Sequence, residues 1–128
     1  MIGYWIFCLS MDLLTPVMMI VFGWLFLKKP PKTINHVYGY RTSRSMKNQQ
    51  TWDFAHKTCG RIWFRGGIVL TILSVPPMLI VLGRGVSTIG IICSVVVGVQ
   101  IIVMFVTLFP VERALKQNFD QYGRKLKK

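Results

Sequence analysis

The sequence predicts an all-α membrane protein, with three transmembrane helices and an interfacial amphipathic helix that leads into the second one. Three observations support this fold class. The 128-residue chain is 52% hydrophobic and only 16% charged, whereas an ordinary soluble domain has about 25% charged residues. Its apolar residues form runs long enough to cross a bilayer. Its 16 Lys and Arg residues, against 4 Asp and Glu, concentrate between and after those runs, where anionic lipid headgroups are the expected contact.

The composition also excludes several classes of protein. A net charge of +12 would suit a nucleic-acid-binding protein, but the apolar runs favour a membrane, so we expect no nucleic-acid partner. The three cysteines, Cys8, Cys59 and Cys93, have no paired spacing, and therefore predict neither a disulfide framework nor a zinc motif. The N-terminal run lacks a basic segment before it and a small-residue cleavage site after it, so we expect no secretory signal peptide. Together these points predict one membrane domain over residues 1–128.

Residues 2–27 form the first predicted span. At about 1.5 Å per residue, this run crosses an apolar core of ~30 Å with some tilt. Pro16 removes one helix hydrogen bond and is expected to kink the helix. Asp12 places a carboxyl group about ten residues into this run. Either it marks a functional site, as intramembrane acids often do, or it faces the bundle or the headgroups as a hydrogen-bonding residue.

Residues 28–47 form a polar loop, and residues 48–65 an amphipathic helix. The loop opens with Lys28-Lys-Pro-Pro-Lys32, and its two prolines cannot continue a helix. Ser45 or Asn48 is expected to cap the helix that follows. Charged residues recur at every fourth position of that helix and form a stripe suited to lipid headgroups: Asp53, Lys57, Arg61 and Arg65.

Residues 62–82 form the second predicted span. It includes the end of the amphipathic helix, because the apolar sequence after residue 67 is short for a membrane helix on its own. Gly66-Gly67 is an expected hinge. Pro76-Pro77 is expected to break the ladder of backbone hydrogen bonds inside the membrane.

Residues 86–111 form the third predicted span, and residues 112–128 a basic tail. Gly90, Ser94 and Gly98 recur every four residues. Such a face of small residues lets another helix approach closely, either within this chain or in a homo-oligomer. Gln100 is a second polar residue inside the membrane and a candidate partner for Asp12.

The distribution of cations predicts the orientation in the membrane. Three spans place the first loop and the tail on the same side. Those two segments are the basic ones, with six cations in residues 28–51 and six after residue 110, against one in residues 83–87. By the positive-inside rule, the N-terminus lies outside and the C-terminus in the cytoplasm.

The sequence contains no recognisable catalytic motif. It has no glycine-rich phosphate loop, no HExxH and no GxSxG, so we expect neither an enzyme nor a cofactor. Asp53, His56 and Cys59 are spaced to share one helix face, but any amphipathic membrane helix can present such a trio, and no metal site is predicted from it. Arg41 is expected to pair with Asp53 or Glu112 and so hold the polar loop against the bundle.

One segment resembles a known family. From residue 29 to about residue 66 the chain has a Pro-Pro turn, an Asn, a Gly-Tyr-Arg-Thr core, a second Asn and then a Trp that opens a helix. This ordered combination is similar to that of the SdpI family of bacterial membrane proteins, in its short, three-span form. The residues that stand at the motif positions or beside them are Asn35, Tyr38, Gly39, Tyr40, Arg41, Thr42, Asn48 and Trp52.

The resemblance implies an immunity protein of the bacterial plasma membrane. Such a protein protects its producer from a secreted, membrane-active peptide, the sporulation delaying protein, by binding and without covalent chemistry. It also implies a cytoplasmic repressor as a partner. Two alternatives remain. One is a small-ligand carrier or membrane enzyme with a polar pocket at the cytoplasmic interface, which predicts a deep cavity containing Arg41 and Trp52. The other is a helix-packing subunit of a membrane assembly.

Overall fold

In the computed structural model, which describes residues 2–35 and 37–126, the chain folds into four helices. They are α1 (Ile2–Lys28), α2 (Gln49–Ile80), α3 (Val86–Val106) and α4 (Leu108–Asn118). The described residues form no β-strand; Phe119 and Lys125 are joined by an isolated β-bridge. The predicted all-α fold is therefore confirmed.

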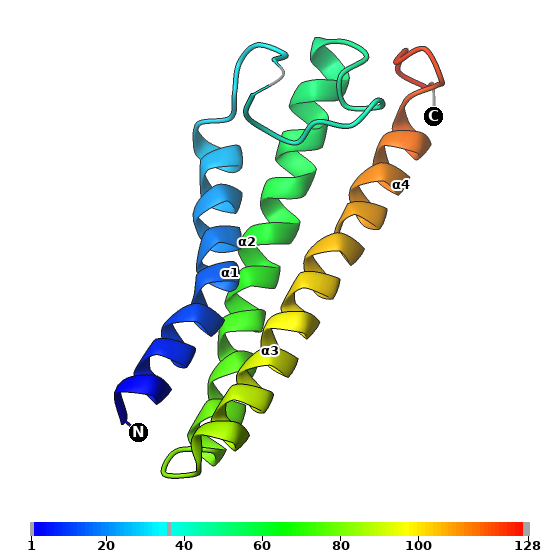
Figure 1. Cartoon of the computed structure of the whole chain (residues 1–128). Coiled ribbons are helices and arrows are strands. Elements are labelled where there is room, and N and C mark those ends of the chain that lie inside the picture. The colour runs from blue at the N-terminus through cyan, green and yellow to red at the C-terminus, as the bar shows by residue number, and fades with distance from the viewer. Residues whose placement is uncertain (1, 36, 127–128) are drawn as a thin grey trace.

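Three helical segments are long and apolar enough to cross a membrane: Ile2–Lys28, Gln49–Ile80 and Val86–Asn118. They run side by side as long rods, and α4 continues the line of α3 (Figure 1). The loop between α1 and α2 and the segment after α4 lie at one end of the bundle, while the N-terminus and the turn between α2 and α3 lie at the other. The two basic segments of the sequence therefore share one end, as three spans require. Of the tail, Lys127 and Lys128 lie outside the described residues, as does His36 in the loop.

Helix α2 unites the amphipathic segment and the second span in one uninterrupted helix. The charged stripe predicted for its first half is exposed, at Asp53, Lys57, Arg61 and Arg65. Neither the hinge expected at Gly66-Gly67 nor the break expected at Pro76-Pro77 interrupts the helix, which ends only at Ile80. Two consecutive prolines can lie inside a helix when the carbonyls that they leave free find other partners or solvent.

The contact between α1 and α2 depends on glycines that the sequence analysis did not predict as helix-packing residues. A Cβ atom added to Gly23 would lie 2.5 Å from the backbone N of Phe64, and one added to Gly60 would lie 2.9 Å from the carbonyl oxygen of Gly23. At Gly67, a Cβ atom would lie 2.8 Å from the carbonyl oxygen of Pro16. Membrane helices use small residues in this way, because close backbone approach increases van der Waals contact.

The small residues predicted to pack helix α3 have fewer close neighbours than the glycines between α1 and α2. The Tyr4 hydroxyl would lie 2.8 Å from a Cβ atom at Gly90, whereas no atom lies within 4 Å of one at Gly98. Ser94 is exposed, and its hydroxyl donates to the Gly90 carbonyl of its own helix. Packing of this face against another chain remains a prediction.

Two apolar clusters close the bundle at its ends. One, at the end with the basic loop, joins α1, the loop, α2 and α4; its buried members are Phe26, Tyr40, Ala55, Cys59, Val111, Leu115 and Phe119. The other, near the N-terminus, joins Cys8, Met78, Val81 and Ile89. The larger cluster surrounds the loop segment with the Gly-Tyr-Arg-Thr core.

Candidate functional site

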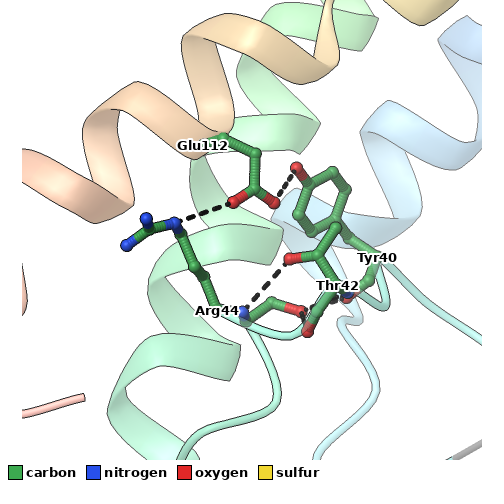
Figure 2. A network of polar contacts seen from close by, with 5 residues as sticks. Tyr40, Thr42, Arg44 and Glu112 are labelled. Atoms are coloured by element: carbon green, nitrogen blue, oxygen red, sulfur yellow. Dashed lines mark hydrogen bonds and ion pairs between the residues drawn. The ribbon is translucent and has the colours of Figure 1, made fainter. Parts of the chain in front are cut away.

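Tyr40 is the centre of the loop between α1 and α2. Its backbone N–H donates to Nε2 of His56 on α2 at 2.9 Å. Its hydroxyl donates to Oε1 of Glu112 on α4 at 2.8 Å, as Figure 2 shows. Burial, together with the hydrogen bond to the Glu112 carboxylate, raises the pKa of the Tyr40 phenol well above its usual value. One residue thus ties the loop to two helices, and its hydroxyl stays a donor throughout the physiological pH range.

His56 is fully buried, and its contacts define its protonation state. Because Nε2 accepts the Tyr40 N–H, that nitrogen carries no hydrogen. The other ring nitrogen, Nδ1, lies 2.8 Å from the carbonyl oxygen of Trp52 and therefore donates to it. The ring also packs on Trp52, with centroids 4.3 Å apart, and edge-on against Phe26 at 4.9 Å. His56 is a neutral, fully engaged side chain in this position.

Gly39 is required by both its backbone angle and its surroundings. Its φ of +117° lies in the region that residues with a side chain rarely adopt. A Cβ atom at this position would lie 2.5 Å from Nε2 of His56. The glycine therefore allows the loop to lie directly on the imidazole, which places the next N–H, that of Tyr40, at bonding distance.

The segment after Tyr40 is a compact turn closed by Thr42 and Ser45. The Thr42 N–H donates to Oγ of Ser45 at 2.8 Å, and the Ser45 N–H donates to Oγ1 of Thr42 at 3.2 Å. The Ser45 hydroxyl also lies 3.0 Å from the Tyr40 carbonyl, to which it donates. Arg44 belongs to this turn, and its side chain points toward Glu112 of α4 (Figure 2).

Asn48 and Trp52 fix the start of α2. The Asn48 side chain accepts the Thr51 N–H at 2.9 Å, and the Thr51 hydroxyl accepts the Asn48 N–H at 3.0 Å, so the two form a capping box. Asn48, rather than Ser45, is the cap. Its Nδ2 donates to the Gly123 carbonyl at 2.6 Å, and Nε1 of the fully buried Trp52 donates to the Pro31 carbonyl at 2.7 Å.

Asn35 and Tyr38 shape the first part of the loop. Oδ1 of Asn35 accepts the N–H groups of Val37 and Tyr38, at 2.9 and 2.7 Å. The Tyr38 ring packs against Phe22 and Phe26 of α1, with centroids 6.1 and 6.0 Å apart, and burial raises the pKa of its hydroxyl. Both residues thus direct the loop back onto α1.

The carboxylate of Glu112 lies between Tyr40 and Arg44. Nε of Arg44 is 3.7 Å from Oε2, and both side chains are partly exposed. Asp53 accepts a hydrogen bond from Gln49 at 2.8 Å. Arg41 lies exposed on the loop. The sequence predicted that Arg41 pairs with Asp53 or Glu112, and that pairing stays a prediction. Glu112 itself binds Tyr40 and Arg44.

Two of the grooves that adjoin the loop include residues from Tyr38 to Thr42. One, of about 300 Å³, is mainly apolar and is lined chiefly by Met18, Phe22, Val37, Tyr38, Trp63 and Met104. The other, of about 280 Å³, has Tyr40, Arg41 and Thr42 on one side and Phe26, Cys59 and Trp63 on the other. Trp52 is completely buried, so it does not form an open cavity together with Arg41.

The metal-ligand trio considered from the sequence does not converge. Asp53 is exposed, whereas His56 and Cys59 are buried, and both ring nitrogens of His56 are engaged with backbone groups. Within residues 2–35 and 37–126, no three His, Cys, Asp or Glu side chains are grouped so that they could hold a metal ion.

The two intramembrane polar residues, Asp12 and Gln100, do lie together, and both are buried. Nε2 of Gln100 donates to the backbone carbonyl of Asp12 at 2.6 Å. That carbonyl needs a donor from outside its helix, because the residue four positions later is Pro16, which has no N–H. Gln100 thus repairs the defect that Pro16 creates in α1.

Sequence reasoning missed the roles of His56, Ser45 and Thr51 in holding the loop. The i, i+4 spacing of Trp52 and His56 was a usable signal, because it places both side chains on the same helix face as the buried Ala55 and Cys59. No pattern in the sequence indicated that a loop N–H would meet the imidazole.

Comparison with known proteins supports the resemblance seen in the motif. The family model described as "SdpI/YfhL protein family" matches residues 32–111, which include the whole loop from Asn35 to Trp52. Among curated proteins, the uncharacterized protein YfhL of Bacillus subtilis (strain 168) is 43% identical over 53 residues, or 41% of this chain. The match spans about half, 48%, of that relative. No solved structure matches the chain.

Proposed function

We propose a function for this chain from the premise that it belongs to the SdpI/YfhL protein family and is a multi-pass membrane protein. The proposed function is immunity: the chain binds a membrane-active peptide and thereby protects the cell that produces it. It does so by non-covalent binding, in the bacterial plasma membrane, with the basic loop and tail in the cytoplasm. The family resemblance supports the first part, and the shared end of the two basic segments supports the orientation.

The observation that carries this proposal is that the motif residues hold the loop in place. Gly39, Tyr40, Thr42, Asn48 and Trp52 hold the loop against α2, α4 and the last described residues through hydrogen bonds and close packing. The polar groups of these residues bind side chains and backbone groups of the same protein. An arrangement of this kind stabilises a shape, whereas a catalytic site presents a nucleophile and base to a substrate. We call this set of contacts the Tyr40 clamp.

The clamp supports the apolar groove between the loop and the spans. Tyr38 and Gly39 of the loop line the groove together with Met18 and Phe22 of α1 and Met104 of α3. Methionine side chains adapt to partners of different shape and are common at such binding surfaces. We propose that an apolar peptide segment lies in this groove while it is inserted in the bilayer.

A survival assay tests the proposal. Sensitive bacteria express the wild-type chain, Met18→Trp or Met11→Trp and are challenged with sporulation delaying protein and with unrelated membrane-active peptides. Met18 lines the groove and Met11 does not; both belong to α1 and are similarly exposed, at 47% and 42%. We expect the wild type and Met11→Trp to raise survival and Met18→Trp, which fills the groove, to lose that protection at equal abundance. A well-expressed wild type that protects against no peptide would overturn the proposal.

The groove beside Tyr40, Arg41 and Thr42 favours a second candidate, a carrier or enzyme for a small ligand. Tyr40, Arg41 and Thr42 give that groove hydrogen-bonding groups beside an apolar wall, as small-molecule sites require. This candidate predicts that a small anionic ligand changes the thermal stability of the wild type and that Arg41→Gln weakens the change. Peptide protection without any ligand response would favour immunity.

A third candidate is a packing subunit that uses helix α3. Gly98 has open space around it and Ser94 is exposed, which would suit the close approach of a helix from a second copy or another protein. The molecular mass in mild detergent separates this candidate from the others. A binding partner for the cytoplasmic end, such as the repressor implied by the family, would increase the molecular mass of the complex solubilised from cells.

A further inference from the structure

The buried cluster around Asp12 has more hydrogen-bond acceptors than donors. It lies where α1, α2 and α3 meet, and its members are Asp12, Ser74, Cys93 and Gln100, with the backbone carbonyls of Cys8 and Leu70. Asp12, Ser74 and Gln100 are at most 3% exposed. The bilayer core holds no bulk water that could supply the missing donors, so each polar atom of the cluster needs a partner at a site that the protein itself builds.

The donors of this cluster are all engaged. The Gln100 amide donates one hydrogen to the Asp12 carbonyl at 2.6 Å and the other to Oγ of Ser74 at 2.7 Å. The Ser74 hydroxyl donates to the Leu70 carbonyl at 2.6 Å. Sγ of Cys93, which has a single hydrogen to donate, lies 3.3 Å from Oδ1 of Asp12 and 3.6 Å from the Cys8 carbonyl oxygen.

Two acceptors are left. Oδ2 of Asp12 and Oε1 of Gln100 are both buried and have no hydrogen-bond donor among the described residues. The hydrogen bond from the Gln100 amide to the backbone carbonyl of Asp12 brings these two residues together. An amide oxygen and an ionised carboxylate oxygen can both only accept, so neither can complete the other.

The cluster contains no Lys or Arg side chain among the described residues. The ion pairs Arg44–Glu112 and Arg124–Asp120 lie at other acids. The titratable group that faces Asp12 is the thiol of Cys93 on α3. Cys8, on the helix of Asp12, takes part through its backbone carbonyl, and α2 presents Ser74 through the shared Gln100 amide. A carboxylate without a cation in this position would be a buried, unpaired charge, which is strongly unfavourable.

We infer that Asp12 is a proton-binding site inside the membrane, whose carboxyl group carries a hydrogen on Oδ2 and donates it to Oε1 of Gln100. One proton supplies the donor that the cluster lacks and gives both remaining oxygens a partner. It also removes the buried charge. The protonated carboxyl group of Asp12 then links α1 to α3 by a hydrogen bond to Gln100. Loss of the proton breaks this hydrogen bond and leaves a negative charge beside the amide oxygen of Gln100.

Infrared spectroscopy of the full chain in lipid tests this inference. We expect a carbonyl band of a protonated carboxyl group at neutral pH in the wild type. The band should be lost in Asp12→Asn and retained in Asp53→Asn, the matched control at an exposed acid. If the wild type and Asp12→Asn give the same carboxyl spectrum, with no protonated band assigned to Asp12, the inference is overturned.

Thermal unfolding in detergent provides an independent test that does not depend on assigning a band. The Asn side chain can donate a hydrogen where the protonated acid does, so we expect Asp12→Asn to unfold within about 4 °C of the wild type. Asp12→Ala, which leaves Gln100 without a donor, should unfold at a clearly lower temperature. Replacing sodium with choline should leave the wild type unchanged. A sodium-dependent rise in melting temperature that Asp12→Asn abolishes would instead identify a cation site and contradict the proton.

Discussion

The Tyr40 clamp and the Asp12 cluster are both networks of polar side chains between helices, but they differ in balance. In the clamp, Tyr40, His56, Thr42, Ser45 and Asn48 each meet a partner of the opposite kind. In the Asp12 cluster, the acceptors outnumber the donors of the protein. The clamp lies at the end of the bundle with partly exposed charges, whereas the cluster lies within the spans.

This difference indicates two kinds of role. A balanced network fixes one geometry and needs nothing from its surroundings, as a structural brace for a loop does. A network that lacks one hydrogen depends on the protonation of a single group, so its stability is linked to the proton. The family motif belongs to the first kind, and the intramembrane acid to the second.

Gly39→Ala should have the largest effect, because it acts on the clamp through both strain and a clash. The new Cβ atom would meet Nε2 of His56 at 2.5 Å, in a backbone conformation with φ of +117°. We expect a loss of about 2–4 kcal/mol in the free energy of unfolding, measured by chemical denaturation in detergent. Gly3→Ala is the control, since no atom lies within 4 Å of its Cβ position. Equal stability of the two variants would show that the loop does not rest on His56.

Gln100→Leu should have the next largest effect and acts on the Asp12 cluster. It removes two hydrogen bonds and leaves the Asp12 carbonyl, already deprived of its helix donor by Pro16, without a partner. The expected loss is about 1–3 kcal/mol in the same measurement. Val99→Leu, at a neighbouring position that is half exposed, should cost far less; if it costs as much, the loss reflects crowding of α3 rather than the cluster.

Tyr40→Phe removes only the hydroxyl contact of the clamp with Glu112. We expect a loss of about 1 kcal/mol at neutral pH. Because the folded state raises the pKa of Tyr40 above the ordinary value of 10.0, the stability from this hydroxyl is full below pH 10 and falls as the pH rises above it. The difference between wild type and variant should therefore shrink in alkaline solution, and a difference that grows with pH would contradict the assigned hydrogen bond.

Arg44→Gln should have the smallest effect. The Arg44 and Glu112 side chains are 43% and 29% exposed and 3.7 Å apart, and ion pairs of this kind contribute little. We expect less than about 0.5 kcal/mol, which should disappear in high salt because exposed charges are screened. If Arg44→Gln lost more free energy of unfolding than Tyr40→Phe, Arg44 rather than the Tyr40 hydroxyl would be the main partner of Glu112.

The fold was predictable from the sequence because its main determinants are one-dimensional. The length of each apolar run and the position of the basic segments are sufficient to predict three spans with the loop and tail at one end. The choice of packing face was not predictable in the same way. Gly90, Ser94 and Gly98 have the regular spacing, but Gly23, Gly60 and Gly67, on two helices, make the close contacts.

The candidate site was predictable as a segment but not as a set of contacts. Asn35 to Trp52 was recognisable from the order of its residues, and Asp12 and Gln100 from their polarity inside apolar runs. The partners of Tyr40 depend on how α2 and α4 meet the loop in three dimensions, which spacing along the chain does not encode. The link between Pro16 and Gln100 was likewise hidden, since it depends on which helix covers a carbonyl freed by the proline.

The Tyr40 clamp is tested most directly by hydrogen exchange of the Tyr40 amide, measured on the full chain in lipid nanodiscs. The account predicts slow exchange, comparable to that of buried amides in α2, because this N–H donates to His56 in a buried contact. It also predicts that His56→Phe, which keeps an aromatic ring but removes the acceptor, makes the exchange fast. Exchange in the wild type as rapid as that of an amide in an unfolded peptide would contradict the clamp and leave the loop as an unanchored connection between two spans.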